Sequence, residues 1–473
     1  MRSTLRKLGL GLALAASAVL SLSPAVAEWQ GPNAQPWFEN YVRPQGYNYA
    51  PSVISENGTT DVWWCGQGAS TDVIYHRSYS ASGGFSPISQ VLYPRQTWNS
   101  RYTCDPSVVK GNFTNPQDGQ HYQYIMYYSG ADNTPGNNNQ LGLAYSNDKI
   151  NWVDYQGDSV LKPIGNASDN YGLGQPSTFN ADGQSSLFVI TTDTSVPADP
   201  NFAQIFVRHT NDGVNFEAPV RVPGRATDGT TVGPNSDFAY DYATGDVYMM
   251  SSLPGRNCNA EPCKDPAHNP DRETYQMALY KMPISQFLSG QPFQWTPLGQ
   301  LSSDQTGYYL NHSPGFNRDP SGNITPFFPT IQIFHSGGDP SPTTWKLTFS
   351  LLNKDNPFAP INRYYNGSIH KVTSGYAGPG FNYEQTLGRA LVAATAATHK
   401  VYSCFTGGDY FLSTAANCEG QQHLGVTGEF FNNNEPNTHA VYRCLAGNHH
   451  FASNDANCEG QTVEGPLGYI YNN

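Results

Sequence analysis

The amino-acid sequence predicts an all-β protein, a five-bladed β-propeller followed by a β-trefoil-like repeat domain. Only 13% of the 473 residues are charged, and Gly, Asn, Ser, Thr and Tyr are abundant, which is typical of many short strands joined by turns. The chain contains two kinds of repeat, a loose one within residues 28–358 and a strict one within residues 359–473. No amphipathic pattern indicates a helix longer than about three turns.

The loose repeat is a phrase of a short strand, a turn rich in Gly, Asn or Asp, and a second apolar or aromatic strand. Radial repetition of such a phrase predicts a propeller, in which few sheet edges are exposed. Five units predict five blades, and they begin at Tyr49, Cys104, Gly174, Pro234 and His312.

In the strict repeat, the phrase that starts at Val401 recurs at Val441, and a third copy at the same spacing starts at Ile361. Three copies with short strands and Gly or Asn turns predict a β-trefoil-like module. We expect it to bind glycan at equivalent positions marked by His370, Tyr410 and His450; a purely structural role is the alternative.

The copies also resemble short modules at the C-termini of secreted bacterial hydrolases. Those modules contain Tyr-Arg-x-Tyr, then His-x-x-Thr, then Glu-Gly-x-x-Gly-Tyr. The first and third copies match in part, at Arg363-Tyr364, His370 and Thr373, and at Tyr442-Arg443, His450, Glu464-Gly465 and Gly468-Tyr469.

The N-terminal segment 1–27 is predicted to be a secretory signal peptide. A basic start is followed by an apolar run over residues 8–20 and by Ala25-Val26-Ala27, a small-x-small cleavage site. We therefore expect a secreted protein, extracellular or periplasmic, that is not membrane-bound after cleavage. Loss of three basic residues changes the formal net charge from −12 to −15.

This negative charge disfavours nucleic acid, anionic lipid and polyanionic substrates, because Coulomb repulsion opposes them. The 30 Tyr and 8 Trp include candidates for stacking on sugar rings, although most such side chains pack in cores or across strands. The expected partner is a neutral polysaccharide or oligosaccharide, and we expect a monomer.

Eight cysteines in an exported chain predict disulfides rather than metal sites. The first C-terminal copy lacks both cysteines of the other two copies, which predicts the bridges Cys404–Cys418 and Cys444–Cys458. Cys65 and Cys104 lie beside corresponding positions of adjacent units and predict a staple between the first two blades. Cys258 and Cys263 are close in sequence and predict a disulfide-tied insertion at the rim.

The phrase Asp105-Pro-Ser-Val, the aromatic second strands and the third-strand phrase "AYSND-x-x-NW" resemble the five-bladed propeller glycoside hydrolases of the arabinanase and β-xylosidase clan, such as family 43. The resemblance covers the loosely repeated region, residues 28–358. It implies an Asp base, a second Asp that tunes pKa, and a Glu acid, all pointing into a central funnel. Carried onto this chain, it implies Asp105 as base, Asp237 in support and His312 in the place of the Glu.

The chain departs from that pattern at Ala50, which stands where the base Asp of the first unit is expected, and at Gln175, which cannot act as an acid. Imidazole can donate a proton near neutral pH, so His312 fits the acid role, with Glu273 as an alternative. Non-catalytic roles are the alternatives. Asp105 would then only stabilise a turn at the start of a strand, and His312 would be a hydrogen-bonded core residue or would bind an ion together with His335. The substrate-binding candidates are Trp64, Arg101, Gln175, Tyr128 and His335.

The leading hypothesis is a secreted glycoside hydrolase that acts on a neutral glycan by an inverting two-group mechanism, without a cofactor. A structural calcium ion in the funnel is left open. The alternative is a non-catalytic carbohydrate-binding propeller that has lost its acid, and a third hypothesis is a propeller lyase or a surface adhesin.

Overall fold

The computed structural model describes residues 28–36, 48–132, 139–165, 171–253, 276–302, 306, 308, 310–327, 330–338, 345–353, 358–374, 377, 381–391 and 394–472. The predicted signal peptide, the Cys258–Cys263 pair and Glu273 lie outside these residues. The all-β prediction is confirmed, because the described segments are mostly strand and include one named α-helix, α1 (Ile284–Phe287). None of the helices in the described segments is long and apolar enough to span a membrane.

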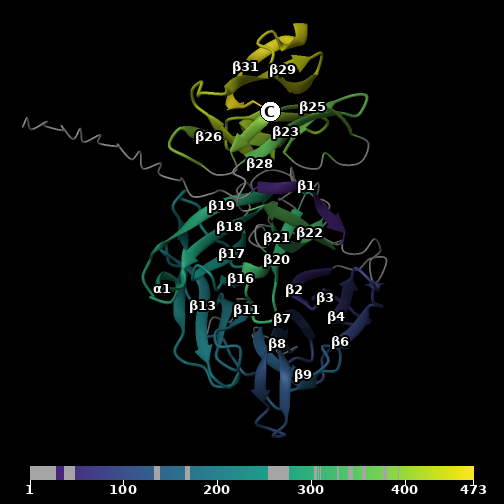
Figure 1. Ribbon diagram of the computed structural model, residues 1–473, viewed down its shortest axis with the longest axis vertical. Coiled ribbons are helices and arrows are strands. Elements are labelled where there is room, and N and C mark those ends of the chain that lie inside the picture. Colours follow the sequence, from purple (N-terminus) through teal and green to yellow (C-terminus); the bar gives the residue numbers. More distant parts are fainter. Residues whose placement is uncertain are drawn as a thin grey trace, which may run out of the picture.

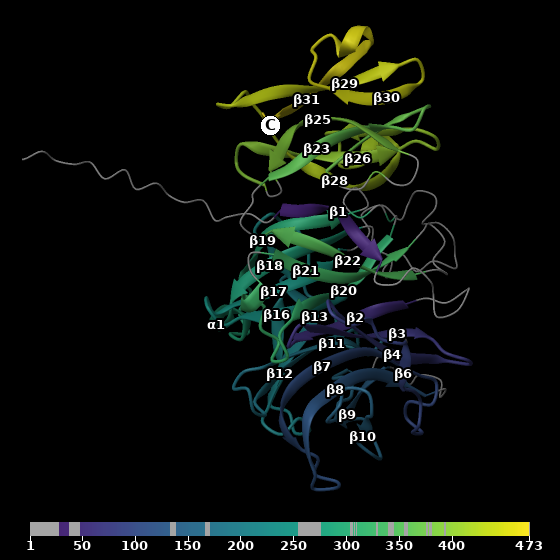
Figure 2. The same ribbon diagram turned by 45° about the vertical axis from the view of Figure 1, so that its right-hand side comes forward.

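The N-terminal body consists of five antiparallel units (Figures 1 and 2). The first contains β2 (Asn48–Glu56), β3 (Thr59–Gln67), β4 (Asp72–Ser80), β5 (Gly84–Phe85) and β6 (Ser89–Leu92). The second contains β7 (Tyr102–Thr114), β8 (His121–Ala131), β9 (Gln140–Ser146) and β10 (Val153–Asp154). The third contains β11 (Leu173–Asn180), β12 (Leu187–Asp193), β13 (Phe202–Thr210) and β14 (Val220–Pro223).

The fourth unit contains β15 (Arg225–Ala226), β16 (Ser236–Asp241), β17 (Asp246–Ser252), β18 (Gln276–Pro283) and β19 (Gln294–Ser302). The fifth contains β20 (Leu310–Arg318), β21 (Thr330–Gly338) and β22 (Trp345–Asn353), with η1 (Thr325–Phe327) between the first two. Its outer strand is β1 (Glu28–Pro36), which pairs antiparallel with β22. The start of the described chain therefore completes the last unit and supplies the outer edge that the unit would otherwise expose.

The first strands of the five units form a closed ring. In cyclic order β2 contacts β7, β7 contacts β11, β11 contacts β16 and β16 contacts β20. The ring closes where β20 pairs with β2 in parallel, at Val53↔Asn317 and Ile54↔Arg318. Each first strand begins at one of the repeated phrases, so these phrases face one another around a common centre.

Side chains of the repeated phrase join neighbouring units. Ser52 Oγ accepts a hydrogen bond from the Val108 backbone amide at 2.9 Å, and Ser177 Oγ accepts one from the Phe238 amide at 3.0 Å. In both pairs a serine that follows proline satisfies a backbone donor on the first strand of the next unit. Buried donors of this kind need a partner, so the phrase encodes the contact between units.

Apolar clusters fill the interfaces between successive units. Ile54, Trp63 and Met126 belong to a cluster between the first and second units, and Phe179 and Trp295 to one between the third and fourth. Three further clusters lie between the second and third, the fourth and fifth, and the fifth and first units. Burial of apolar surface between sheets, at about 25 cal/mol per Å², thus stabilises the whole ring.

The C-terminal module consists of three copies of one long strand, one short strand and a second long strand. The first copy contains β23 (Phe358–Tyr365), β24 (His370–Thr373) and β25 (Asn382–Leu391). The second contains β26 (Thr398–Phe405), β27 (Tyr410–Ser413), η2 (Cys418–Gly420) and β28 (Gln422–Phe431). The third contains β29 (Thr438–Ala446), β30 (His449–Ser453), η3 (Cys458–Gly460) and β31 (Thr462–Tyr471).

The three copies enclose a shared core with near three-fold symmetry. The strands β25, β28 and β31 pair with one another, and the core side chains recur at the spacing of the sequence repeat. The recurring core residues are Ile361, Val401 and Val441; Val372, Leu412 and Ala452; Leu387 and Leu467; and Ala390, Phe430 and Ile470. The buried polar Thr427 takes the place equivalent to Leu387 and Leu467.

Ion pairs join the third copy to its two neighbours. Arg443 Nη1 lies 2.5 Å from Glu419 Oε1 of the second copy, and Arg363 Nη1 of the first copy lies 2.7 Å from Glu459 Oε1 of the third. At the remaining junction, Ser403 stands where the other copies have arginine. Among the described residues, Ser403 therefore forms no ion pair equivalent to these two at the junction of the first and second copies.

Three predicted disulfides are confirmed, Cys65–Cys104, Cys404–Cys418 and Cys444–Cys458. The two C-terminal bridges lie within single copies, as the joint absence of cysteines from the first copy predicts. The first bridge links the end of β3 to the start of β7.

Removing a C-terminal bridge should loosen its own copy. The double variant Cys444→Ala, Cys458→Ala frees a loop of about 15 residues, for which loop-closure entropy corresponds to about 3 kcal/mol. Hydrogen–deuterium exchange followed by mass spectrometry should then show faster exchange in β29 and β31, with β12 as the internal control. Unchanged exchange in β29 would contradict a stabilising role for this bridge.

Candidate functional site

A depression lies at the centre of the ring of first strands. Its lining comes from corresponding places in all five units, which is why residues distant in sequence meet there. The lining residues are Ala50, Pro51, Asp105, Pro106, Gln175, Pro176, Ser236, Asp237 and Pro314.

The backbone is left-handed at the same step in four of the five units. The residue before proline has a φ of 51° at Ala50, 47° at Asp105, 39° at Gln175 and 48° at Ser313. The strand register shifts at each of these steps, as in a β-bulge, which bends a strand and re-aims a side chain. Non-glycine residues seldom adopt such angles, and the cost is about 1–3 kcal/mol each.

The fourth unit lacks this bulge. Asp237 takes the place of the serine that follows proline in other units, because its Oδ2 accepts from the Phe316 amide as Ser177 Oγ accepts from the Phe238 amide. The pairing of β16 with β17 runs without a shift from Ser236 to Asp241. Ser236 alone therefore stands where the other units have the residue–proline step, and Ser313 is the equivalent of Asp105 in the fifth unit.

Asp105 is a buried carboxylic acid, 2% exposed. Tyr171 donates a hydrogen bond from its hydroxyl to Asp105 Oδ2 at 3.0 Å. Burial raises the pKa of Asp105 to about 6, although hydrogen bonds from Tyr171 and from the Gln175 backbone act to lower it. A carboxyl group that titrates near pH 6 can take up or release a proton under mildly acidic conditions, which suits general acid or base catalysis.

A second carboxylate, Asp72, lies close to the same place. Its negative charge also raises the pKa of Asp105. An oxygen of Asp72 and the sulfurs of Cys65 and Cys104 all lie within 4.8 Å of one another. Because those sulfurs form a disulfide, they are not available as thiolate metal ligands, and the bridge instead holds β3 and β4 against the strand that bears Asp105.

Asp237 lines the depression but is held by its neighbours. Its Oδ1 accepts a hydrogen bond from Ser177 Oγ at 2.6 Å, and its Oδ2 accepts one from the Phe316 amide at 2.7 Å. Arg318, 1% exposed, places Nη1 3.5 Å from Asp237 Oδ1 and also bonds to the Phe238 carbonyl. Asp237 thus connects the third, fourth and fifth units.

His312 directly precedes the left-handed Ser313 and is half-buried. Its Nε2 accepts a hydrogen bond from Asn235 Nδ2 at 3.0 Å, and it is not among the lining residues. Gln175 does line the depression and donates from Nε2 to Ser313 Oγ at 2.8 Å. The amide therefore spans from the third unit to the fifth.

The other predicted substrate-binding residues lie away from the lining. Trp64 is buried and donates from Nε1 to Asn48 Oδ1 at 2.8 Å, and Tyr128 is buried against Trp98 with ring centroids 5.8 Å apart. His335 is completely buried beside Ser350, and burial lowers the pKa of His335 to about 4. Arg101 is exposed on the surface.

Tyr171 and Asp72 were not predicted from the sequence. Tyr171 precedes β11 by two residues and Asp72 begins β4, so neither belongs to the repeated phrase. Each reaches Asp105 only through the packing of different units, and a pattern within one chain segment does not indicate such a contact.

His370, Tyr410 and His450 line a small pocket in the C-terminal module. Their short strands β24, β27 and β30 contact one another, so the three side chains surround the pseudo-three-fold axis. His450 Nδ1 lies 2.5 Å from Asp409 Oδ2, whereas His370 lies against His449, with ring centroids 5.5 Å apart. Ser403 also lines this pocket, at the junction of the first and second copies.

No protein-family model and no curated protein matches this chain. Among solved structures, it is similar to the α-L-arabinofuranosidase from Podospora anserina in complex with cellotriose, with 12% identity, coverage of 70% of this chain and 97% of that chain, and a TM-score of 0.43. A thermostable family-43 glycoside hydrolase has 14% identity, coverage of 73% and 99%, and a TM-score of 0.42.

A third similar structure is an N-acetylgalactosamine deacetylase from F. plautii in complex with blood group B trisaccharide. It has 15% identity, coverage of 69% of this chain and 95% of that chain, and a TM-score of 0.44. Each of these scores lies below 0.5, so the description of the fold depends on the strand pairing given above.

The raised pKa of Asp105 predicts a pH-dependent gain in stability for Asp105→Asn. The wild-type group favours folding when it is protonated, and this contribution is lost as the pH rises from about 4 through about 6. At pH 8 the variant should be more stable than the wild type by on the order of 3 kcal/mol, and the difference should shrink toward zero by pH 4. Urea unfolding at several pH values measures this, and a constant difference would contradict it.

Asp237→Asn should behave in the opposite way. The amide of Asn places a donor where Ser177, Phe316 and Arg318 already donate. The free energy of unfolding should therefore fall by about 3 kcal/mol. Urea unfolding at pH 7 measures this loss, with Asp246→Asn as a control because Asp246 pairs with Lys281 outside the depression. Unchanged stability would show that Asp237 does not join the units.

Proposed function

We propose that this protein is a secreted glycoside hydrolase that acts on a neutral polysaccharide or oligosaccharide, with Asp105 as a proton-transferring group. In this proposal the five units are the blades of a β-propeller, and residues 359–473 form a β-trefoil-like carbohydrate-binding module. The observation that carries the proposal is the buried carboxyl of Asp105, with a pKa of about 6, at the lining of the central depression.

The local backbone supports a functional role for this carboxyl group. A turn residue at a strand start would be solvated, whereas Asp105 is buried and its φ of 47° aims it toward the centre. Strained angles persist where surrounding structure fixes them, and they cluster at functional sites. The Cys65–Cys104 bridge and the Tyr171 hydrogen bond fix the residue on both sides.

Hydrolysis of a glycosidic bond needs two groups, one to protonate the leaving oxygen and one to assist water or form a covalent intermediate. Asp72 is one candidate for the second group, because its charge raises the pKa of Asp105, although Asp72 is not among the residues that line the depression. His312 is the other candidate, although Asn235 holds its ring. Like charges close together separate two pKa values and so separate an acid from a base.

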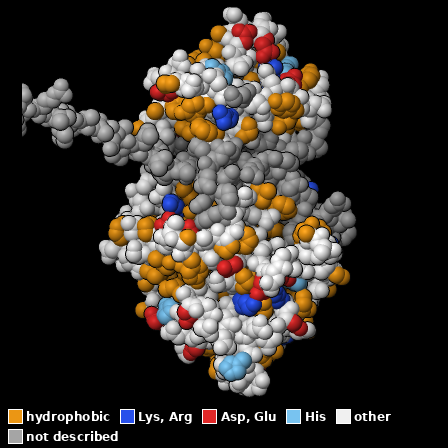
Figure 3. Space-filling view, viewed as in Figure 1, with side chains coloured by type: hydrophobic (Ala, Val, Ile, Leu, Met, Phe, Trp, Pro, Cys, Tyr) orange, Lys and Arg blue, Asp and Glu red, His pale blue; other side chains and the backbone are white. Residues whose placement is uncertain are grey.

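Charge supports a neutral substrate. The chain has a formal net charge of −12, and both titratable residues in the lining, Asp105 and Asp237, are acidic. Figure 3 shows Asp and Glu side chains interspersed with Lys and Arg over the described part of one face. A polyanionic glycan would be repelled from such a centre.

The alternative is a carbohydrate-binding protein without catalysis. It is favoured by one observation, that Asp237 is committed to Ser177, Phe316 and Arg318. In that case Asp105 and Gln175 would orient a bound sugar by hydrogen bonds only. A bound calcium ion stays a prediction under either function.

The decisive test measures the reducing ends released from a panel of plant, algal and microbial polysaccharides. The wild type should release sugars from at least one of them, and Asp105→Asn should do so at least about a hundredfold more slowly. Asp246→Asn is the matched control and should retain full activity. No release from any glycan, with binding retained, would favour the non-catalytic alternative.

The pH profile of kcat/KM assigns the role of Asp105. If Asp105 is the acid, activity should fall as the pH rises above about 6; if it is the base, activity should fall as the pH drops below about 6. Asp72→Asn should remove the opposite limb of the profile. A limb that persists in Asp72→Asn would transfer the second role to His312.

A further inference from the structure

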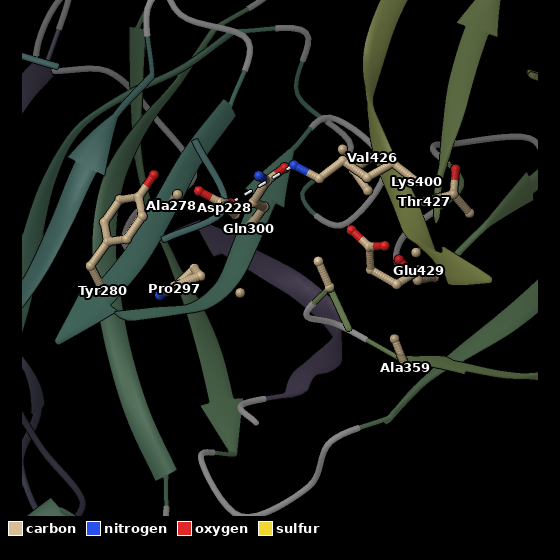
Figure 4. Close-up of a pocket in the computed structure, with 14 residues that line it drawn as sticks. Asp228, Ala278, Tyr280, Pro297, Gln300, Ala359, Lys400, Val426, Thr427 and Glu429 are labelled. Carbon is tan, nitrogen blue, oxygen red and sulfur yellow. Dashed lines mark ion pairs between the residues drawn. The ribbon is translucent and has the colours of Figure 1, made fainter. Parts of the chain in front are cut away.

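Two neighbouring hollows, together called the interdomain cleft here, lie between the N-terminal body and the C-terminal module, and Figure 4 shows residues that line the first of them. The two hollows share Gln300, Lys400 and Val426 in their linings. The body contributes residues near β15, β18 and β19, and the module contributes residues of β26 and β28. Ligand sites occur preferentially at such interfaces between domains.

Charged groups of the module face the body across this cleft. Lys400 and Glu429 are register partners on β26 and β28, and Lys400 Nζ lies 3.9 Å from Asp228 Oδ2 of the body. Figure 4 shows Lys400 extending toward Asp228, with Glu429 beside it. Glu429 is only 3% exposed, and burial raises the pKa of its carboxyl group against the effect of Lys400.

This charged pair is specific to the second copy. The equivalent register partners are Pro360 and Arg389 in the first copy, and Ala440 and Tyr469 in the third. The repeat fold therefore forms without a Lys–Glu pair at these places. The first copy also contacts the body, through β23 and β1, but only in the second copy does a charged pair line the hollow, which indicates a role for the cleft rather than for the module itself.

The body side of the cleft offers acceptors that lack protein partners. Gln276 Oε1 and Gln300 Oε1 are buried atoms without a hydrogen-bond partner among the described residues. A buried polar atom left unpaired costs about 1–3 kcal/mol, so a group that donates to these oxygens gains affinity by removing that cost. Gln276 lines one hollow and Gln300 lines both.

The balance of donors and acceptors indicates the ligand class. Two amide oxygens and the carboxylates of Asp228 and Glu429 can accept hydrogen bonds, whereas the ammonium group of Lys400 and the hydroxyl groups of lining residues such as Tyr280 and Thr427 can donate them. Tyr402 and His423 line the second hollow with ring centroids 5.3 Å apart. Acceptors beside an aromatic ring match the hydroxyl groups and the apolar face of a sugar.

We propose that this interdomain cleft is a second glycan-binding site, which holds a neutral, hydroxyl-rich stretch of polysaccharide away from the central depression. The proposal rests on the proposed function in one respect, that the ligand of the protein is a neutral glycan. It does not require hydrolysis.

The test compares variants of the full chain in affinity gel electrophoresis with soluble arabinoxylan, arabinan, β-glucan and agaro-oligosaccharides. Gln300→Leu removes the acceptor at similar volume, and Glu429→Gln removes the charge at the same shape. Each should weaken binding of at least one probe about tenfold, as expected for one lost hydrogen bond to a buried group. Gln461→Leu, an exposed glutamine of the third copy that does not line the cleft, is the matched control.

A stability measurement separates ligand binding from a structural role. Gln300→Leu removes an unpaired buried acceptor, so its urea midpoint should stay equal or rise while its glycan affinity falls. Loss of stability together with affinity would assign Gln300 to domain packing and overturn the proposal. Unchanged affinity of both variants, or no binding of any probe by the wild type, would overturn it as well.

The outcome of the binding test is independent of the outcome of the hydrolysis assay. Cleft-dependent binding without release of reducing ends would reject the proposed hydrolase and retain the cleft site. Release of reducing ends without any effect of the cleft variants would do the reverse. Preferential binding of glucosamine oligomers would replace a neutral ligand by a cationic one and contradict the ligand class argued here.

Discussion

The hydrogen bonds between successive first strands determine both the closure of the ring and the shape of its centre. Ser52, Ser177 and Asp237 each accept from a backbone amide of the next first strand. Two of these acceptors follow directly after the Ala50-Pro51 and Gln175-Pro176 steps, and the third lines the depression itself. A substitution that moves one unit outward therefore also changes the shape of the depression. The left-handed angles, which cost energy individually, are sustained because closure of the ring fixes the residues on either side.

The fold was predictable to the extent that it repeats. Five similar phrases indicated five antiparallel units, and the strict C-terminal period indicated three equivalent copies whose core residues recur at the same interval. The two C-terminal disulfides followed from comparing copies, because Tyr364 and Gly378 replace both partners in the first copy, and Cys65–Cys104 followed from corresponding positions of adjacent units. The place of β1 as the outer strand of the fifth unit was not predictable. The pairing of Glu28–Pro36 with β22 joins opposite ends of the sequence of the N-terminal body, and no repeated motif indicates it.

The candidate site was predictable only where it coincides with the repeated phrase. Asp105 and Gln175 follow from their place before proline, and both line the depression. Asp237 was predicted as the second Asp of the family pattern, but its partner Arg318 lies in another unit, and that pairing makes it a connecting residue. Trp64 and Tyr128 illustrate a different limit. Aromatic residues beside inner strands suit both sugar stacking and core packing, and here burial in the interface between units placed them in the core.

Departures from symmetry in the C-terminal module are more informative than the symmetry itself. A module selected for stability alone would keep its best contacts in every copy, yet Ser403 replaces the arginine of the other copies, and the Lys400–Glu429 pair occurs once. Both exceptions belong to the second copy, whose strand β28 contacts β19 of the body, whereas the first copy contacts the body through β23 and β1. Ser403 lines the axial pocket, and the charged pair adjoins the interdomain cleft. The simplest physical account is that the second copy has exchanged internal contacts for contacts with something outside the module.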